Sequence, residues 1–278
     1  DAVARLQALA QGLGHGEVVR QAPVLEDGAN AALGHGPRES WLFNSGLQGV
    51  EKADAVLLIG VNPRVEAPLL NARLRKAWLK GDMEIGLIGE QTDLTFDYAY
   101  LGAGTQTLAK LPKSALDFLT KAERPAIIVG SGALGGEGGP AVLNALGALA
   151  KKVGVVADGW NGFNVLHHAA SRVAGLDMGF VPGAGGLTVG EMLKPDALDV
   201  LFLLGADEVD PTGSNAFRVY LGSHGDNGAH GADVILPGAA WAEESGQIRA
   251  GVPLTDRMQL ALRYGLTFSD ISLAEDIY

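Results

Sequence analysis

The feature that most constrains the fold is a series of short, unbroken apolar runs separated by stretches with helical spacing. Continuous apolar runs, rather than alternating ones, are typical of strands that are covered on both faces in a parallel sheet. The pattern therefore predicts an α/β fold with mostly parallel sheets. The runs lie at 55–60, 84–89, 126–130, 153–158, 199–205 and 232–238.

The stretch PAVLNALGALAKKVG, residues 140–154, shows what separates the runs. Its apolar residues recur at helical spacing and so fall on one side of a helix. Lys151 and Lys152 end the last turn, and Gly154 follows, where glycine is preferred after a helix. Pro140 is expected to begin this helix, which should pack on a sheet.

Two stretches share one arrangement, which suggests two similarly built lobes. Residues 52–68 and 195–211 both run from an acidic start through an apolar strand and a glycine to a polar turn that ends on proline. A chain of 278 residues is long enough for roughly two domains. Proline and charge at 109–125 separate two strand–helix series, so we expect the first lobe at 1–118 and the second at 119–278.

The composition excludes several classes of function. The formal net charge is −11, from 21 Lys+Arg and 32 Asp+Glu, which disfavours nucleic acid as a partner. The chain has no cysteine, which excludes disulfides, thiolate nucleophiles, zinc sites with sulfur ligands and cysteine-ligated iron–sulfur clusters. The mean hydropathy is +0.16, yet Gly, Pro or charge interrupts every apolar run before the ~18 residues that a membrane span needs. The first fourteen residues indicate an amphipathic helix rather than a signal peptide.

A dinucleotide-binding fingerprint follows the run at 126–130. Gly130, Gly132 and Gly135 have the required spacing, and Asp158 at the end of the next run could hold a ribose. However, the third glycine should lie in the first helical turn, whereas Gly-Glu-Gly-Gly intervenes before Pro140. A wide glycine turn is therefore favoured over an NAD site.

The turn GVNPRVEAP after the first run has two interpretations. It would lie at the carboxyl end of a parallel strand, where α/β sheets bind ligands, with Asn62 and Arg64 offered to a nucleotide. Alternatively, Asn62 caps a helix that Pro63 begins. Spacing alone favours the cap.

Two groups of histidines could be considered as metal ligands. His224, Asp226 and His230 lie in a glycine-rich loop, but their spacings of two and six do not fix three ligands on one face, so a loop that enters a strand is favoured. His167 and His168 are adjacent, so a helix or strand would point them in different directions. Neither group predicts a metal centre.

A catalytic acid–base pair or serine nucleophile is not indicated either. Glu243 and Glu244 have no companion nucleophile nearby, and a solvated pair is favoured. The sequence contains no Gly-x-Ser-x-Gly, the setting of a nucleophile elbow.

Three blocks in order, residues 40–78, 124–139 and 224–246, resemble the C-terminal part of the large iron–sulfur subunit of proton-pumping NADH:quinone oxidoreductase, respiratory complex I. The resemblance covers about residues 20 to 246 and is most specific in the first and third blocks. That region is similar in turn to molybdopterin oxidoreductases such as formate dehydrogenase. The resemblance implies two Rossmann-like lobes with mostly parallel sheets.

In molybdopterin oxidoreductases, a strand followed by Gly-x-Asn-Pro helps to hold the pterin dinucleotide, and an Ala-Asp-Val-x-Leu-Pro segment belongs to the opposing lobe. Gly60, Asn62 and Pro63 match the first pattern. The second is matched by Ala232, Asp233, Val234, Leu236 and Pro237. The resemblance implies a vestigial pocket without a cofactor, a metal or a catalytic residue. Its candidate residues are Gly60, Asn62, Pro63, Arg64, His224, Asp226 and Asp233.

The function implied by the resemblance is a non-catalytic scaffold that supports the cluster-bearing domain. The iron–sulfur clusters are expected in cysteine-rich segments nearer the N-terminus of the subunit, so the chain resembles an excised C-terminal portion. Partners would be other peripheral-arm subunits, without nucleic acid or membrane insertion, on the cytoplasmic side of a bacterial inner membrane or the mitochondrial matrix side.

Two departures and two alternatives remain. The opening fits the family loosely, and after Gln247 its usual aromatic, Val-Asn and Glu-Gly-Arg pattern is absent, so nothing is carried over beyond Gly246. One alternative is an active molybdopterin-dinucleotide-binding fragment in which Ser or a carboxylate replaces a cysteine metal ligand. The other is a nucleotide-binding α/β enzyme, because residues 124–134 also resemble the central domain of thiamine-diphosphate enzymes.

Overall fold

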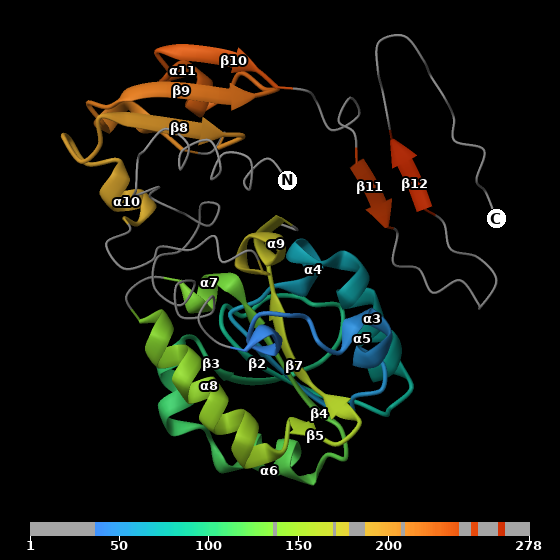
Figure 1. Ribbon diagram of the computed structural model, residues 1–278. Helices are drawn as coiled ribbons and strands as arrows, with labels where there is room; N and C mark the ends of the chain where they lie inside the picture. Colours follow the sequence, from blue (N-terminus) through green and yellow to red (C-terminus); the bar gives the residue numbers. More distant parts are fainter. Residues whose placement is uncertain are drawn as a thin grey trace. The chain divides into compact units, whose positions relative to one another are not determined.

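The computed structural model describes most of the chain between Pro37 and Gly238 (Figure 1). The amphipathic helix expected in the first fourteen residues lies outside the described part. The described ranges are 37–135, 138–168, 171–177, 187–206 and 209–238, with the antiparallel strands β11 (Gly246–Arg249) and β12 (Ala261–Tyr264). Within these ranges, no helix combines the length and apolar character required to cross a bilayer.

The chain forms two compact units, unit 1 from Asp1 to Val189 and unit 2 from Gly190 to Tyr278. This division differs from the one expected at 118/119, which falls inside helix α6 (Lys113–Lys121) of unit 1. The strand that follows α6 pairs with the first strand of the same sheet. The proline and charge at 109–125 thus belong to a surface connection within one sheet, made of η2 (Thr105–Lys110) and α6, and not to a linker.

Unit 1 is built on a five-stranded parallel sheet. Its spatial order is β3 (Ala99–Gly102), β2 (Glu84–Ile88), β1 (Ala55–Ile59), β4 (Pro125–Gly130) and β7 (Phe163–Leu166). From β1 the chain moves outward to β3, then returns to the other side of β1 for β4 and β7. Because parallel crossovers are right-handed, this reversal places helices on both faces of the sheet. The point of reversal lies between β1 and β4.

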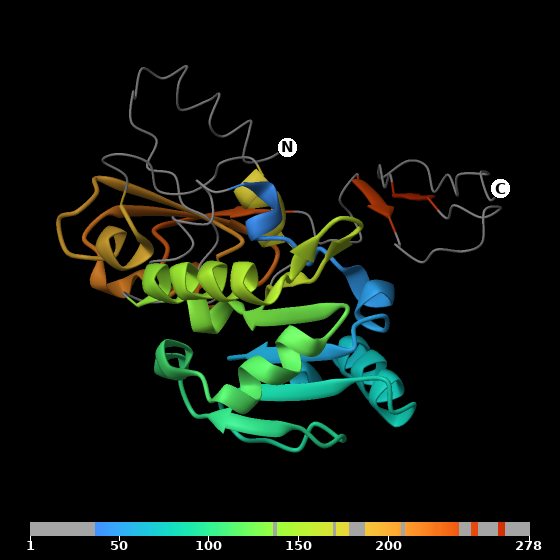
Figure 2. The ribbon, with the colours of Figure 1, turned by 90° about the horizontal axis from the view of Figure 1, so that it is seen from below.

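The two faces of this sheet have separate apolar cores. Helices α6 and α8 (Gly139–Val153) cover one face, which includes Leu57, and α3 (Gly46–Val50) and α5 (Pro68–Leu79) cover the other, which includes Leu58. In Figure 2 the strands lie side by side and α6 crosses them. Every residue of β1 is buried, as its unbroken apolar run predicts.

Most predicted elements are confirmed, with one correction. The runs at 55–60, 84–89 and 126–130 form β1, β2 and β4, and α8 has proline in its first turn and ends at Gly154, whose φ is +71°. The run at 153–158, in contrast, forms only β5 (Val156–Ala157), in a hairpin with β6 (Trp160–Asn161). The sheet strand is β7, which the sequence patterns did not indicate.

Two segments of unit 1 that are far apart in the sequence are held together. Arg38, in η1 (Arg38–Ser40), donates from Nε and Nη2 to the carboxylate of Asp177 at 2.9 and 2.7 Å. The indole Nε1 of Trp41 donates to the same carboxylate at 3.1 Å. Asp177 is the last residue of α9 (Ser171–Asp177), so these bonds join two segments of unit 1 that are 139 residues apart in the sequence.

Unit 2 contains a three-stranded parallel sheet in the order β10-β9-β8. The strands are β8 (Val200–Leu204), β9 (Phe217–Gly222) and β10 (Val234–Pro237), and α10 (Val189–Met192) precedes them. Between the strands lie η3 (Pro211–Gly213) and α11 (Asn227–His230). The runs at 199–205 and 232–238 thus form strands as predicted, and the chain advances across this sheet in one direction.

The repeated stretches at 52–68 and 195–211 hold equivalent positions in the two units. Each contains the first strand of its sheet, followed by a glycine in the left-handed region, Gly60 at φ +55° and Gly205 at φ +56°. Pro63 then begins α4 (Pro63–Glu66), and Pro211 begins η3.

Candidate functional site

The candidate residues of unit 1 lie at the carboxyl edge of its sheet. The turn from Gly60 to Arg64 follows β1, and Gly130 ends the neighbouring β4. Between these strands the connections diverge to opposite faces, which is where open α/β sheets bind ligands. A nucleotide or pterin site would therefore be expected here.

The two turns, however, pack directly against each other. A Cβ at Gly130 would lie 2.2 Å from the carbonyl oxygen of Gly60, and a Cβ at Gly60 would lie 2.6 Å from Cβ of Ala133. Ala133 belongs to α7 (Ser131–Leu134), which begins immediately after β4. Backbone and one small side chain thus occupy the space between the ends of β1 and β4.

Pro63 begins α4 as predicted, but the expected cap by the Asn62 side chain is wrong. That side chain makes no capping hydrogen bond, and its Oδ1 is buried without a hydrogen-bond partner in the described part of the chain. Instead, the backbone N–H of Asn62 donates to Oε1 of Glu66 at 2.5 Å. The helix start is therefore held by a carboxylate from the end of its own single turn.

The guanidinium of Arg64 binds the loop that follows β2. Its Nη1 donates to Oδ2 and to the carbonyl oxygen of Asp93 at 2.7 and 2.9 Å. Asp93 also accepts from the N–H of Thr95 at 2.8 Å, and this bond and that from Arg64 lower the pKa of the Asp93 carboxyl. Arg64 is thus engaged within unit 1 rather than offered to a ligand.

The adjacent histidines follow β7 and diverge, as predicted. His167 Nε2 lies 2.7 Å from the carbonyl oxygen of Trp41, and burial lowers the pKa of this imidazole. His168 Nε2 lies 3.7 Å from Oε2 of Glu66. Glu66, which sequence reasoning missed, therefore links the Asn62 turn to the end of β7. Its position four residues after an Asn-Pro helix start was the only available signal.

The dinucleotide fingerprint is not assembled. In place of a wide glycine turn, the one-turn helix α7 occupies Ser131–Leu134. Asp158 is exposed in the β5–β6 hairpin, which precedes β7. This hairpin lies beside Pro125, the first residue of β4, because Trp160 Nε1 donates to the Pro125 carbonyl at 2.9 Å. The acid is thus at the amino edge of the sheet, opposite Gly130.

The candidate residues of unit 2 do not share one edge of their sheet. His224 and Asp226 follow β9, whereas Asp233 precedes β10, so parallel strands separate them to opposite edges. His224 and Asp226 are exposed, and Asp226 begins α11 by accepting the N–H groups of Ala229 and His230 at its backbone carbonyl. Within the described ranges, no cluster of three His, Asp or Glu side chains could hold a metal ion. Glu243 and Glu244 lie outside those ranges.

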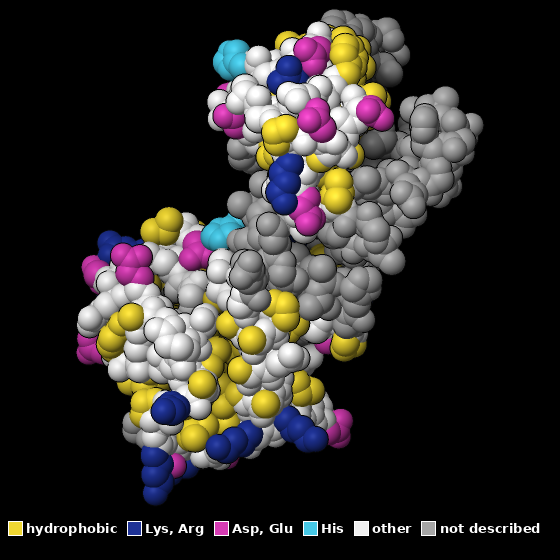
Figure 3. All heavy atoms as spheres, turned by 90° about the vertical axis from the view of Figure 1, so that its left-hand side faces the viewer, with side chains coloured by type: hydrophobic (Ala, Val, Ile, Leu, Met, Phe, Trp, Pro, Cys, Tyr) yellow, Lys and Arg dark blue, Asp and Glu magenta, His cyan; other side chains and the backbone are white. Residues whose placement is uncertain are grey.

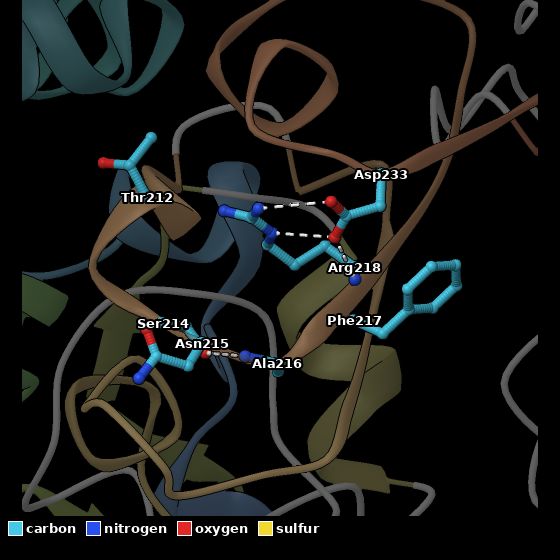
Figure 4. Close-up of a pocket in the computed structure, with 7 residues that line it drawn as sticks. All are labelled: Thr212, Ser214, Asn215, Ala216, Phe217, Arg218 and Asp233. Carbon is cyan, nitrogen blue, oxygen red and sulfur yellow. Dashed lines mark hydrogen bonds and ion pairs between the residues drawn. The ribbon is translucent and has the colours of Figure 1, made fainter.

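Asp233 is bound by an arginine of the neighbouring strand (Figure 4). Its Oδ2 accepts from the backbone N–H of Arg218 at 2.8 Å and from Nε at 3.1 Å, and the side-chain and then the backbone bond lower the pKa of this carboxyl. The pair lines an open depression of about 470 Å³ at the amino ends of β9 and β10. This ion pair joins β9 to β10 and leaves Asp233 committed to a structural role.

Comparison with known proteins identifies the family. The profile of molybdopterin oxidoreductases matches residues 2–258. The chain is 42% identical over 221 residues to the NADH-ubiquinone oxidoreductase 78 kDa subunit, mitochondrial, of Candida albicans. It is 41% identical over 223 residues to the protein of the same name from Neurospora crassa. It is 38% identical over 214 residues to NADH dehydrogenase [ubiquinone] iron-sulfur protein 1, mitochondrial, of Solanum tuberosum.

These alignments cover most of this chain but a minor part of each relative. They span 77% of the chain and 29% of the two fungal proteins, and 75% of the chain and 28% of the potato protein. The resemblance to the large iron–sulfur subunit of complex I, drawn from the ordered motifs, is thereby confirmed. On its sequence match and its parallel α/β sheets, the chain belongs to the molybdopterin oxidoreductase family.

Proposed function

We propose that the chain is a non-catalytic scaffold portion of the large iron–sulfur subunit of a proton-pumping NADH:quinone oxidoreductase. In that role it supports the cluster-bearing part of the subunit and contacts neighbouring subunits of the peripheral arm, on the matrix or cytoplasmic side of the membrane. The observation that carries the proposal is the packing of Ala133 and Gly130 onto Gly60, which fills the position where a sheet of this type would bind a ligand.

The residues that match the pterin-binding pattern do not fit a pterin dinucleotide. A phosphate at a strand end needs free N–H groups and positive charge. Here the N–H of Asn62 already donates to Glu66, whose carboxylate would repel a phosphate. The guanidinium of Arg64, which follows the matched residues, is bound to Asp93. No step of a molybdenum reaction is therefore assigned to these residues.

The absence of cysteine favours a structural role over electron transfer. Iron–sulfur clusters in proteins are held mainly by cysteine thiolates, and this chain has none. In the proposed assembly, the clusters are held by another part of the subunit.

The expectation that the chain binds no cofactor is tested on protein purified from cells. Calorimetric titration with NADH, FAD and thiamine diphosphate is expected to show no binding heat, and molybdenum analysis is expected to read at background. A stoichiometric pterin or one molybdenum per chain would overturn the proposal and favour the molybdopterin alternative. Saturable heat with a nucleotide would favour the nucleotide-binding enzyme.

The supporting role is tested through the exposed surface of unit 1. Figure 3 shows hydrophobic side chains beside Lys and Arg side chains on the face of unit 1 that is turned away from α4 and α5. Val65 on α4 and Leu69 on α5 are 74% and 73% exposed. In cells that assemble the complex, Val65→Asp with Leu69→Asp is expected to lower incorporation of the subunit on native gels without changing the unfolding midpoint of the isolated chain.

The matched control is Gln91→Asp with Thr105→Asp, which adds the same charge at positions away from Val65 and Leu69. Equal incorporation of both double variants would remove Val65 and Leu69 from the contact surface. If neither double variant reduces incorporation of the subunit, the proposed supporting role fails for unit 1.

One observation favours the molybdopterin alternative. Asn62 Oδ1 and Ser131 Oγ, at the ends of β1 and β4, are both buried without a hydrogen-bond partner in the described part of the chain. Buried polar atoms normally have partners, so a bound ligand or water is one way to satisfy them. Replacement by Asn62→Ala separates the alternatives, since a pterin held there would be lost and a scaffold would be little affected.

A further inference from the structure

The outer side of helix α5 has the residue spacing of a coiled-coil seam. The inner side of this helix, which includes Leu70, Leu74 and Ala77, belongs to a core of unit 1. On the outer side, Leu69 and Leu79 are 73% and 62% exposed. Exposed residues recur there at intervals of three, four and three positions, which is the mean spacing of 3.5 that a heptad repeat requires. This outer stripe consists of Leu69, Ala72, Lys76 and Leu79.

The positions beside the outer stripe are basic. In the heptad register that places Leu69 at position a, Ala72 and Leu79 take the d positions. The e and g positions that follow Leu69 are Arg73, Arg75 and Lys80, the C-cap residue. Residues 68–79 include no Asp or Glu. Because charges at e and g determine which helix a coiled coil accepts, this side of α5 favours a partner helix with Asp or Glu at the facing positions.

The cations of this side are only partly neutralised within unit 1. Glu51 accepts from Nη1 of Arg73 at 2.5 Å and from Nζ of Lys76 at 2.9 Å. Nη1 of Arg75 donates to the carbonyl oxygen of Thr95, which carries no formal charge. The cation at the second e position forms no ion pair in the part of the chain that the structure describes. This basic side therefore stands out on a chain whose net charge is −11.

A lipid surface fits this side of α5 less well than a protein helix does. Helices that bind membranes keep one whole side apolar, whereas Lys76 interrupts the outer stripe. An anionic bilayer would also repel a chain with a net charge of −11. The stripe extends over about 15 Å, which about three turns of a facing helix would cover.

We propose that the outer side of α5 binds an acidic amphipathic helix of a neighbouring subunit. The apolar side chains of that helix lie on the outer stripe, and its carboxylates face the basic e and g positions. This inference rests on the proposed function, since it names the chemistry of one partner that a supporting subunit contacts.

A designed peptide tests this chemistry on the chain itself. The probe is a helical peptide of about three heptads with Leu at a and d and Glu at e and g, and its control has Lys in place of Glu. The chain is expected to bind the Glu peptide about tenfold more tightly than the Lys peptide. Added salt should weaken this binding, because the facing charges are exposed.

Charge reversal locates the binding surface. Arg75→Glu with Lys80→Glu should abolish the preference for the Glu peptide without changing the unfolding midpoint of the chain. The matched control is Lys110→Glu with Lys113→Glu, which changes the charge equally at exposed positions outside α5 and should retain the preference.

Cross-linking identifies the partner in cells that assemble the complex. A photoreactive residue, p-benzoylphenylalanine, in place of Ala72 is expected to give a product with another subunit, in a helical segment that carries Asp and Glu. Arg75→Glu with Lys80→Glu should lower the yield of this product and the incorporation of the subunit about tenfold. Changing the cross-linked carboxylates to Lys should restore both.

Four results would overturn the inference. They are equal binding of the two peptides, tighter binding to phosphatidylglycerol vesicles than to the Glu peptide, a cross-link from position 72 to the chain itself, and normal incorporation of the Arg75→Glu with Lys80→Glu variant. If Val65→Asp with Leu69→Asp still lowers incorporation, the supporting role stands and only the acidic partner is lost.

Discussion

Units 1 and 2 begin with the same arrangement of strand, left-handed glycine and proline turn, yet their first strands have different surroundings. All five residues of β1 are buried, whereas burial alternates along β8. The difference comes from strand order: the chain reverses direction at β1 and places helices on both faces, but it advances in one direction from β8 to β10. A run of apolar residues therefore indicates a strand, while topology decides how many of its faces the neighbouring connections cover.

The same difference determines where a ligand site could exist. Unit 1 has a point of reversal between β1 and β4, and there the backbone of Gly60 and Gly130 occupies the space. The three described strands of unit 2 have no reversal, so their carboxyl edge offers no comparable crevice. Among the described strands, those of unit 1 therefore have the order of a ligand-binding sheet, and the residues of unit 1 fill the point of reversal.

The largest effect is expected from truncating the buried first strand of unit 1. Leu57 and Leu58 belong to the cores on opposite faces of the sheet. Leu57→Ala and Leu58→Ala are each expected to lower the free energy of unfolding by about 2–5 kcal/mol. Leu203→Ala, on the covered side of β8, is the reference in unit 2. Urea unfolding checks all three, and a cost below about 1 kcal/mol for either β1 variant would mean that its face is not a packed core.

A smaller effect is expected at the filled point of reversal. Gly130→Ala would force a methyl group against the carbonyl oxygen of Gly60 and is expected to cost about 1–3 kcal/mol in the free energy of unfolding. The control is Gly132→Ala, two residues along, where a Cβ meets nothing within 4 Å. Equal unfolding midpoints for the two variants would show that the turns after β1 and β4 separate easily, which would weaken the contrast with unit 2.

The smallest effect concerns the buried histidine of unit 1. Because burial lowers the pKa of His167, the unfolded chain binds a proton below about pH 6.5 that the folded chain does not. Stability is therefore expected to fall as the pH drops from about 7 through 6.5 toward the folded pKa. His167→Gln should flatten this change in urea midpoint, and His168→Gln, which alters the exposed neighbour, should retain it. A pH dependence unchanged by His167→Gln would assign it to other groups.

The sequence predicted the elements that carry a strong local signal. The unbroken runs of β1, β2 and β4 and the proline and glycine that bound α8 identified those elements correctly. In β7, by contrast, the buried polar Asn164 interrupts the apolar pattern, and its side chain bonds the nearby carbonyl of Gly162 and the distant Ser45. The division between units was misplaced because proline and charge mark a surface connection as readily as a linker.

The position of the turn after β1 was predicted, but its contacts were not. Motif order located Gly60, Asn62 and Pro63 at the end of β1, which the structure confirms. Two contacts of this turn could not be predicted, because they join segments far apart in the sequence. Asp93 binds Arg64 from about thirty residues away, and Ala133 packs on Gly60 from about seventy residues away. Asp158 was misplaced for a related reason, since its apolar run enters a hairpin rather than the sheet.

The bidentate ion pair of Arg38 with Asp177, reinforced by Trp41, holds residues 38 and 177 of unit 1 side by side. Domains with adjacent ends tolerate insertion into a host loop and circular permutation. A short peptide that joins residues 38 and 177, with new termini opened in an exposed turn such as that around Gly81, should therefore yield a permuted form of residues 38–177 that retains both cores.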